Sequence, residues 1–281
     1  MKLWVNGSAT PADQPSLSAL DRGFTLGDGL FETMRAQEGV VFRLDAHLAR
    51  LSTGARLLGI PLPPGLREQV ADAARGEGEC RNASIRLTVS RGVAPPGLAP
   101  PERAEPTVAI VAHPVVRPRV PEPIVAIMAA GRRNEHALTA GVKTLAYTES
   151  IVALAQARAA GAGDAIFLDT AGHVSEAAAS NLFAVIDDVL VTPPLSCGVL
   201  PGITRAAVLE LAGALGIPVV QRELAELELA AASEIFLTSS IREIAPVVRV
   251  ATAAVGTGQH GQVTVRIVEA YRALVRLECA S

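Results

Sequence analysis

Lysine is the residue whose distribution in this chain points most directly to chemistry. Of the 25 basic residues, only Lys2 and Lys143 are lysines, and the other 23 are arginines. A lysine amine can lose its proton and bond covalently to a carbonyl carbon, whereas a guanidinium stays protonated in proteins. Lys2 lies at a terminus, where a solvated lysine is ordinary, but Lys143 stands in mid-chain in TAGVKTLAY. Lys143 is therefore a candidate for covalent chemistry, with the chance survival of one lysine as the alternative.

The segment LPGITRAAVLELA offers a place for an anion. Pro201 and Gly202 form a turn that leads directly into a predicted helix. The first amides of a helix have no partners within the helix and carry the positive end of its dipole. The amides of Ile203 and Thr204, with the Thr204 hydroxyl, would suit a phosphate. A capped helix after a turn is the simpler interpretation of this segment taken alone.

One carboxylate stands among small uncharged residues. Glu176 lies in SEAAASNLF, between a turn and a predicted strand. Such a carboxylate either points to solvent or pairs with a cation held in the protein. A protonated pyridine nitrogen is a cation of this kind, and a surface position is the alternative.

Two further segments have side chains suited to an anion. Arg50 in DAHLARL lies away from the leucine stripe of its helix, which is typical of a solvated arginine. Ser239, Ser240 and Ile241 follow a predicted strand, and hydroxyls and amides at such an end can form one side of an anion cup. A serine-rich turn without a ligand is the alternative.

The elements that must position these residues alternate between strands and helices. An apolar run ending in Asn-Gly predicts a hairpin at the start of the chain. Leucines and alanines at helical spacing predict a helix over residues 44–58, ended by Gly59 and Pro61. Further helices are expected at residues 65–75, 148–163, 203–217 and 266–278, and strands at 23–44, 83–92, 106–114, 123–131, 164–169, 180–194, 218–224 and 233–240.

The proline-rich segment 113–123 is the best candidate for a domain boundary, because prolines favour an extended connector. The length of 281 residues suits two domains. We therefore expect an α+β protein with a small N-terminal α+β domain over residues 1–115. A larger C-terminal α/β domain over residues 116–281 would carry the lysine.

Composition excludes several classes of protein. The net charge of -3 provides no basic surface for nucleic acid or an anionic membrane. Three distant cysteines, Cys80, Cys197 and Cys279, predict neither a disulfide framework nor a metal site. No apolar stretch is long enough for a signal peptide or a membrane span, so a cytoplasmic location is expected.

The order of the motifs resembles one family from end to end. GDGLFETMR, HLARL, VKTLAY, SEAAASNLF, LPGITR and TSSIREIAPV follow one another as in class IV aminotransferases, also called fold type IV pyridoxal-phosphate enzymes. That family includes branched-chain and D-amino acid aminotransferases and aminodeoxychorismate lyases. The resemblance covers roughly residues 3–250 and implies a fold like that of D-amino acid aminotransferase.

The resemblance also implies roles for individual residues toward the cofactor pyridoxal 5'-phosphate. Lys143 matches the lysine that forms a Schiff base with the cofactor, and Glu176 matches the glutamate beside the pyridine nitrogen. Tyr147 resembles a tyrosine that approaches the ring in several relatives. The residues matching the phosphate contacts are Arg50, Ile203, Thr204, Ser240 and Ile241. The partners implied are amino acid and keto acid substrates and a second subunit in a homodimer.

The reaction implied is transfer of an amino group between an amino acid and a 2-keto acid. A 4-amino-4-deoxychorismate lyase, releasing pyruvate and 4-aminobenzoate, is the main alternative, because one scaffold supports both reactions. FET at 31–33 resembles the D-aminotransferase and lyase branches more than the branched-chain one. A non-catalytic binder of a phosphorylated small molecule is a distant alternative.

Two departures from the family pattern bear on the site. SRGVAPPGLAPP lacks the second arginine, or the Arg-x-His pair, that the D-aminotransferase and lyase branches often use for the substrate carboxylate. Ala146 replaces an asparagine common beside the lysine. Four arginines are candidates for the carboxylate, and the sequence does not rank them: Arg86, Arg91, Arg132 and Arg133.

Overall fold

The computed structural model describes residues 2–11, 13–14, 17–75, 82–116, 118 and 120–280. The chain divides into two compact units. Unit 1 comprises residues 1–117, 143–146 and 275–281, and unit 2 comprises residues 118–142 and 147–274. The mixture of helices and strands agrees with the expected α+β class.

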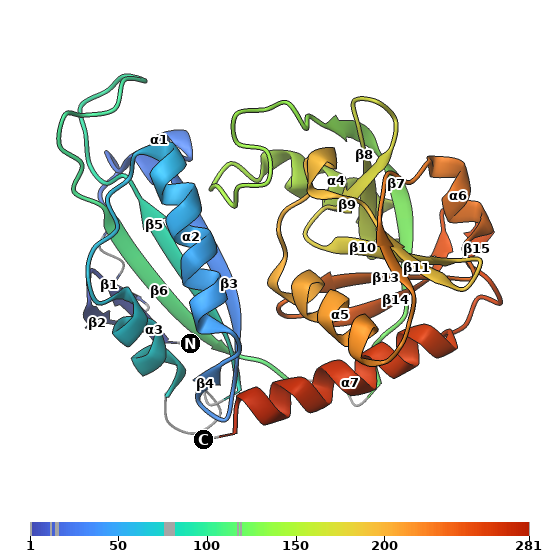
Figure 1. The fold of residues 1–281 in the computed structure, drawn as a ribbon. Helices are drawn as coiled ribbons and strands as arrows, with labels where there is room; N and C mark the ends of the chain where they lie inside the picture. Colours follow the sequence, from blue (N-terminus) through green and yellow to red (C-terminus); the bar gives the residue numbers. More distant parts are fainter. Residues whose placement is uncertain are drawn as a thin grey trace. The chain divides into compact units, whose positions relative to one another are not determined.

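The described strands of unit 1 form one antiparallel sheet (Figure 1) in the order β2-β1-β6-β5-β3-β4. Every second residue of the central strand β5 is apolar and fully buried, as the period of two of a strand requires. The Asn-Gly hairpin is confirmed, because β1 and β2 pair across it. The strands are β1 (Lys2–Val5), β2 (Ser8–Thr10), β3 (Gly29–Gln37), β4 (Val40–Val41), β5 (Ala83–Ser90) and β6 (Thr107–Pro114).

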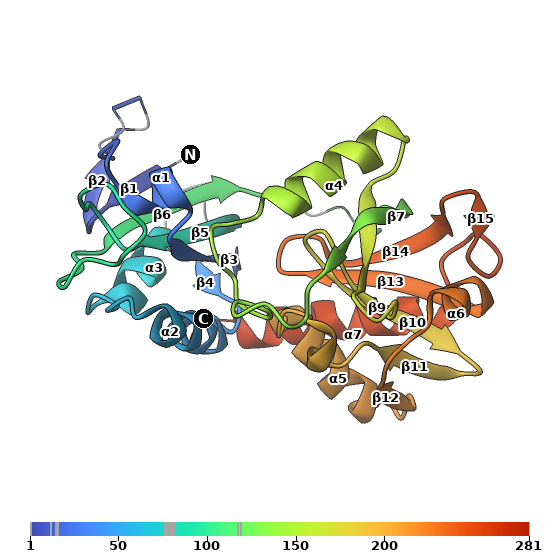
Figure 2. The same cartoon turned by 90° about the horizontal axis from the view of Figure 1, so that it is seen from above.

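Helices α2 (Leu44–Leu58) and α3 (Leu66–Ala74) cover the same face of this sheet in both views (Figures 1 and 2). The predicted end of α2 is confirmed, since Gly59 caps it in the left-handed conformation that glycine adopts readily. The prediction that strands begin at residue 23 was wrong for α1 (Arg22–Leu26). Asp21 accepts a hydrogen bond from the Gly23 amide and starts this short helix.

The segment 143–146 packs with unit 1 although its neighbours in the chain belong to unit 2. The Phe31 amide donates to the Lys143 carbonyl at 3.1 Å, and the Leu145 amide donates to the Gly29 carbonyl at 2.9 Å. Residues 143–145 thus pair with the start of β3 in the manner of a short antiparallel strand. Because of this backbone pairing, Lys143 packs with unit 1. The sequence predicted that the C-terminal domain would carry it.

The described strands of unit 2 form a mixed sheet in the order β12-β11-β10-β13-β14-β7-β8-β9, with β15 beside β14. The pairs β11–β12, β14–β7 and β7–β8 are parallel, and the others are antiparallel. All six residues of β8 are buried, as in a strand covered on both faces. The strands are β7 (Ile124–Arg133), β8 (Asp164–Asp169), β9 (Val174–Ala177), β10 (Asn181–Ile186), β11 (Val189–Thr192), β12 (Val219–Gln221), β13 (Glu234–Ser239), β14 (Glu243–Val250) and β15 (Ala253–Ala254).

Helices lie on both sides of this second sheet. Figure 2 shows α4 (Thr148–Ala159) on one side and α5 (Ile203–Ala214) on the other. The remaining α-helices are α6 (Glu226–Ala231) and α7 (Gln262–Glu278), and η2 (Leu195–Cys197) is a short 3-10 helix. Within the described residues, no helix combines the length and the apolar character that crossing a bilayer requires.

Candidate active site

Lys143 lies half-buried against the β3 strand. Its backbone is held by the Phe31 amide, and its Nζ lies 4.3 Å from the centroid of the Phe31 ring. Arg86, from the neighbouring strand β5, also stacks on this ring, with its guanidinium carbon 3.9 Å from the centroid. Two cations therefore share one aromatic ring, as cation–π attraction allows.

Arg50 is not the solvated arginine that its place on the helix indicates, because only 10% of its side chain is exposed. Its Nε and Nη2 donate to the two oxygens of Glu32 at 2.8 and 2.6 Å. His47, one turn earlier on α2, contacts the same carboxylate through Nδ1 at 2.7 Å. Glu32 is fully buried on β3, and its carboxylate binds the side chains of both Arg50 and His47 on α2. The fork of Arg50 is thereby fixed.

The charges in this cluster follow from burial and pairing. Burial raises the pKa of Glu32, but the hydrogen bonds from Arg50 and His47 outweigh it, so the net pKa is lowered. Burial lowers the pKa of His47 despite the carboxylate beside it. His47 is therefore neutral near pH 7, and its Nδ1 carries the proton that it donates to the ionised Glu32.

In unit 2, Glu176 lies within β9 with 14% of its side chain exposed. One oxygen accepts from the Leu200 amide at 3.0 Å and from Asn181 Nδ2 at 3.2 Å. The other lies 4.0 Å from Arg133 Nε. These donors and the cation favour an ionised carboxylate, which is the state that can accept a hydrogen bond from a pyridinium.

Asn181 joins Glu176 to the start of α5. Its Nδ2 also donates to the Leu200 carbonyl at 2.9 Å. A Cβ at Gly202 would lie only 1.9 Å from Asn181 Oδ1, so the turn before α5 requires glycine to approach this closely. The sequence analysis did not name Asn181 as a site residue. It belongs to the SNLF motif, but no other sequence feature distinguishes it.

The start of α5 has the chemistry of an anion site. The capping residue Gly202 provides no side-chain acceptor for the first amides of this twelve-residue helix. Thr204 is buried beside them in the first turn. On β13, against which α5 packs, the buried Thr238 Oγ1 has no hydrogen-bond partner among the described residues. The first turn of α5 therefore has donors that suit a phosphate.

Ser240 and Ile241 lie half-buried in the turn between β13 and β14. Ser239 and Glu243 pair across this turn, and the Arg242 amide donates to Ser239 Oγ at 3.2 Å. Tyr147 is half-buried in unit 2, where it precedes α4 and its carbonyl accepts from the Ile151 amide at 3.0 Å.

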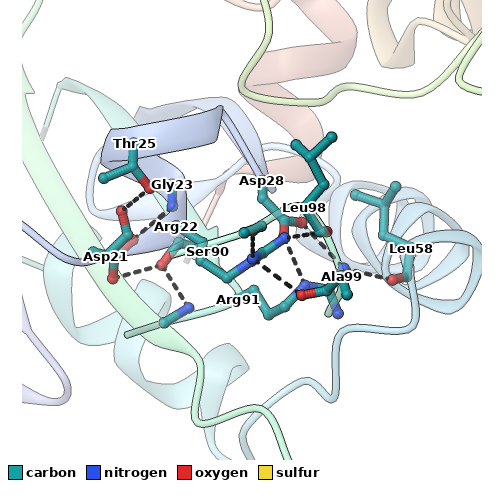
Figure 3. Close-up of polar contacts among 12 residues, drawn as sticks. Asp21, Arg22, Gly23, Thr25, Asp28, Leu58, Ser90, Arg91, Leu98 and Ala99 are labelled. Carbon is teal, nitrogen blue, oxygen red and sulfur yellow. Dashed lines mark hydrogen bonds and ion pairs between the residues drawn. The ribbon is translucent and has the colours of Figure 1, made fainter. Parts of the chain in front are cut away.

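The structure now distinguishes the four arginines considered for the substrate carboxylate. Arg91 is buried and donates to Asp28 and to the carbonyls of Leu58 and Gly59 (Figure 3). Arg133 donates to Ser150 and stacks on Phe167. Arg86 is exposed and shares a ring with Lys143. Arg132 is also exposed and lies in unit 2.

Arg22 belongs to the same network as Arg91 (Figure 3). Its Nε donates to Asp28 Oδ2 at 2.7 Å, as does Arg91 Nε. The remaining nitrogens of Arg22 donate to three successive carbonyls of the proline-rich loop between β5 and β6, namely those of Gly97, Leu98 and Ala99. The carboxylate of Asp28 therefore links the loop, through Arg22, to the end of α2, through Arg91.

The described cysteines take no part in these clusters. Cys197 and Cys279 are buried, whereas Cys80 lies outside the described residues. Burial raises the pKa of Cys197 to about 12, so its thiol stays protonated near neutral pH.

The family model "Amino-transferase class IV" matches residues 29–250, and the chain belongs to this family. It is therefore an aminotransferase of fold type IV, and the cofactor of this family is pyridoxal 5'-phosphate.

Three similar proteins span nearly the whole chain. A putative branched-chain-amino-acid aminotransferase of Methanocaldococcus jannaschii is 36% identical over 97% of this chain and 96% of its own length. The branched-chain aminotransferase structure of Escherichia coli has a TM-score of 0.91 at 31% identity, covering 100% of this chain and 96% of that one. The 4-amino-4-deoxychorismate lyase structure of Pseudomonas aeruginosa has a TM-score of 0.84 at 35% identity, covering 96% and 98%.

Proposed function

We propose that the chain transfers amino groups between α-amino acids and 2-keto acids with pyridoxal 5'-phosphate bound covalently to Lys143. The observation that carries the proposal is the placement of Lys143, the only lysine beyond the N-terminus, on a segment that pairs with β3. Family membership supports the same conclusion.

The proposed cofactor contacts are those that the resemblance to class IV aminotransferases implies. Lys143 would provide the amine and Arg50 a guanidinium for the phosphate, held in orientation by Glu32. Glu176 would receive the pyridine N–H, and Tyr147 would approach the ring. The phosphate takes the remaining contacts from Ile203, Thr204, Ser240 and Ile241.

The proposed roles follow from the chemistry of these groups. The bound cofactor supplies a ring that withdraws electrons from the substrate Cα. With the cofactor bound, the Nζ of Lys143 would be the base that accepts the Cα proton. Glu176 remains ionised and keeps a proton on the ring nitrogen. The first turn of α5 and Arg50 would bind the phosphate of the cofactor.

Arg86 is the proposed partner of the substrate carboxylate. Its guanidinium and the Lys143 amine lie 3.9 and 4.3 Å from the same ring centroid, so the two groups are at most about 8 Å apart. The carboxylate of an amino acid is attached to the carbon whose proton Lys143 removes. A guanidinium at this distance can bind that carboxylate through two parallel hydrogen bonds.

Amino acids with branched apolar side chains are the substrates to test first, because branched-chain aminotransferases are among the similar proteins. The lyase is the second candidate. It is favoured by 35% identity to the Pseudomonas aeruginosa lyase over 96% of this chain. The proposal also includes a homodimer and a cytoplasmic location, as the resemblance and the composition predict.

The absorption spectrum of the purified protein tests the reaction. We expect a visible band from lysine-bound cofactor that bleaches when L-leucine, L-glutamate or D-alanine is added in separate cuvettes. Bleaching by one of them identifies the preferred substrate and its handedness. A band that survives all three, together with release of pyruvate and 4-aminobenzoate from 4-amino-4-deoxychorismate, would replace the aminotransferase by the lyase.

A further inference from the structure

Asp164, at the start of β8, is a fully buried carboxylate with no role in the proposed chemistry. Its Oδ1 accepts from the amides of Ala165 and Ala178 at 2.9 and 3.2 Å. Its Oδ2 accepts from Arg242 Nη1 at 2.8 Å. Each oxygen therefore holds a different segment of unit 2.

The two segments are those that carry proposed cofactor contacts. Ala178 lies two residues after Glu176, in the turn that leads from β9 to β10. Arg242 follows Ser240 and Ile241 directly, in the turn between β13 and β14. Asp164 thus connects the pyridine end of the proposed site to its phosphate end.

Arg242 is anchored at both its side chain and its backbone. Besides the bond to Asp164, its Nη2 donates to the Gly163 carbonyl at 3.2 Å, and its amide donates to Ser239 Oγ at 3.2 Å. These bonds fix the three-residue turn that contains Ser240 and Ile241. Burial raises the pKa of Asp164, and the bonds from Ala165, Arg242 and Ala178 oppose this rise.

We infer that Asp164 and Arg242 are positioning residues that set the spacing between Glu176 and the Ser240–Ile241 turn for the cofactor. The inference rests on the proposed function. Asp164 acts on both ends of the site, whereas Arg242 acts on the phosphate end alone. The two residues should therefore have different effects on ligands with and without a phosphate.

The test compares the dissociation constants of pyridoxal 5'-phosphate and pyridoxal, measured by equilibrium dialysis on apoprotein. For Arg242→Met we expect at least about tenfold weaker binding of pyridoxal phosphate and less than threefold change for pyridoxal. Asp164→Asn should weaken both ligands by at least about tenfold. Arg222→Met is the matched control, because Arg222 is similarly exposed (40% against 45%) and pairs with Glu228 in the same unit.

The Arg242 variant keeps the test decisive if the Asp164 variant does not fold, since the Arg242 side chain is 45% exposed. Folded Arg242→Met protein that binds pyridoxal phosphate like the wild type would overturn the inference. Equal weakening of pyridoxal and pyridoxal phosphate by Arg242→Met would also overturn it. Wild-type protein that binds neither ligand would contradict the proposed function itself, so the two failures are distinguishable.

Discussion

The carboxylate of Glu32 on β3 binds both Nε and Nη2 of Arg50 on α2, at 2.8 and 2.6 Å, although the residues are 18 positions apart. Glu32 is fully buried, so this pair is shielded from solvent. The pair fixes the guanidinium that we propose for the cofactor phosphate.

Glu32→Gln should reduce both stability and cofactor binding, because it leaves the buried Arg50 without its ionic partner. Breaking a buried pair in this way typically costs about 3 kcal/mol of unfolding free energy. Urea unfolding of the apoprotein measures this loss, and dialysis measures the affinity for pyridoxal phosphate. Glu68→Gln, at an exposed position of α3, is the control. Unchanged stability and affinity in Glu32→Gln would contradict this role.

His47 makes the stability of the chain sensitive to pH in the range below about 6.5, the ordinary pKa of histidine. Its pKa is lowered in the folded protein, chiefly by burial, so the unfolded chain binds a proton there that the folded chain does not. The free energy of unfolding should therefore fall as pH decreases through this range. His47→Gln should flatten this part of the profile, because it removes the group that titrates differently in the folded and unfolded chain. Identical profiles for wild type and His47→Gln would count against the assignment.

The hydrogen bonds of Arg22 predict that this one side chain protects the loop between β5 and β6 from proteolysis. Arg22→Gln removes hydrogen bonds to three successive carbonyls, each worth about 1 kcal/mol. Trypsin should then cleave after the exposed Arg103 at least about tenfold faster, since cleavage requires the loop to open. Arg67→Gln, an exposed position of α3, serves as the control. Equal cleavage rates would show that Arg22 does not restrain the loop.

Arg86→Gln tests the proposed carboxylate partner. Loss of a charge-assisted hydrogen bond of about 1.5–3 kcal/mol should lower kcat/KM by about 10- to 100-fold. The cofactor band should stay intact, because Arg86 is not proposed to contact the cofactor. Arg132→Gln is the comparison, since Arg132 is the other exposed candidate. A loss in Arg132→Gln with normal kinetics in Arg86→Gln would transfer the role to Arg132.

Patterns of neighbouring residues predicted the elements whose conformation depends on neighbouring residues alone. The Asn-Gly turn gave the β1–β2 hairpin, and the leucine spacing with Gly59 gave α2. Helix α1 was missed because apolar residues between glycines resemble a strand, whereas the cap by Asp21 decides the conformation.

The contacts of the candidate site depend on partners distant in the sequence. Arg50 was interpreted as solvated because helical periodicity contains no information about Glu32 on β3. Residues 143–146 pack with unit 1 through pairing with β3, which no local pattern indicates. Asp164 and Arg242 are 78 positions apart, and only the sheet of unit 2 brings them into contact. The order of the motifs identified the family, because motif order does not depend on these contacts.

Mass spectrometry after borohydride reduction tests the central claim most directly. Reduction should fix the cofactor permanently to the lysine that holds it, and arginine-specific digestion then locates the modified peptide. The chain contains only two lysines, so the result has few interpretations. We predict one phosphopyridoxyl group on Lys143 and none in Lys143→Ala. Modification of Lys2 alone, or no modification of wild-type protein incubated with pyridoxal phosphate, would contradict the account.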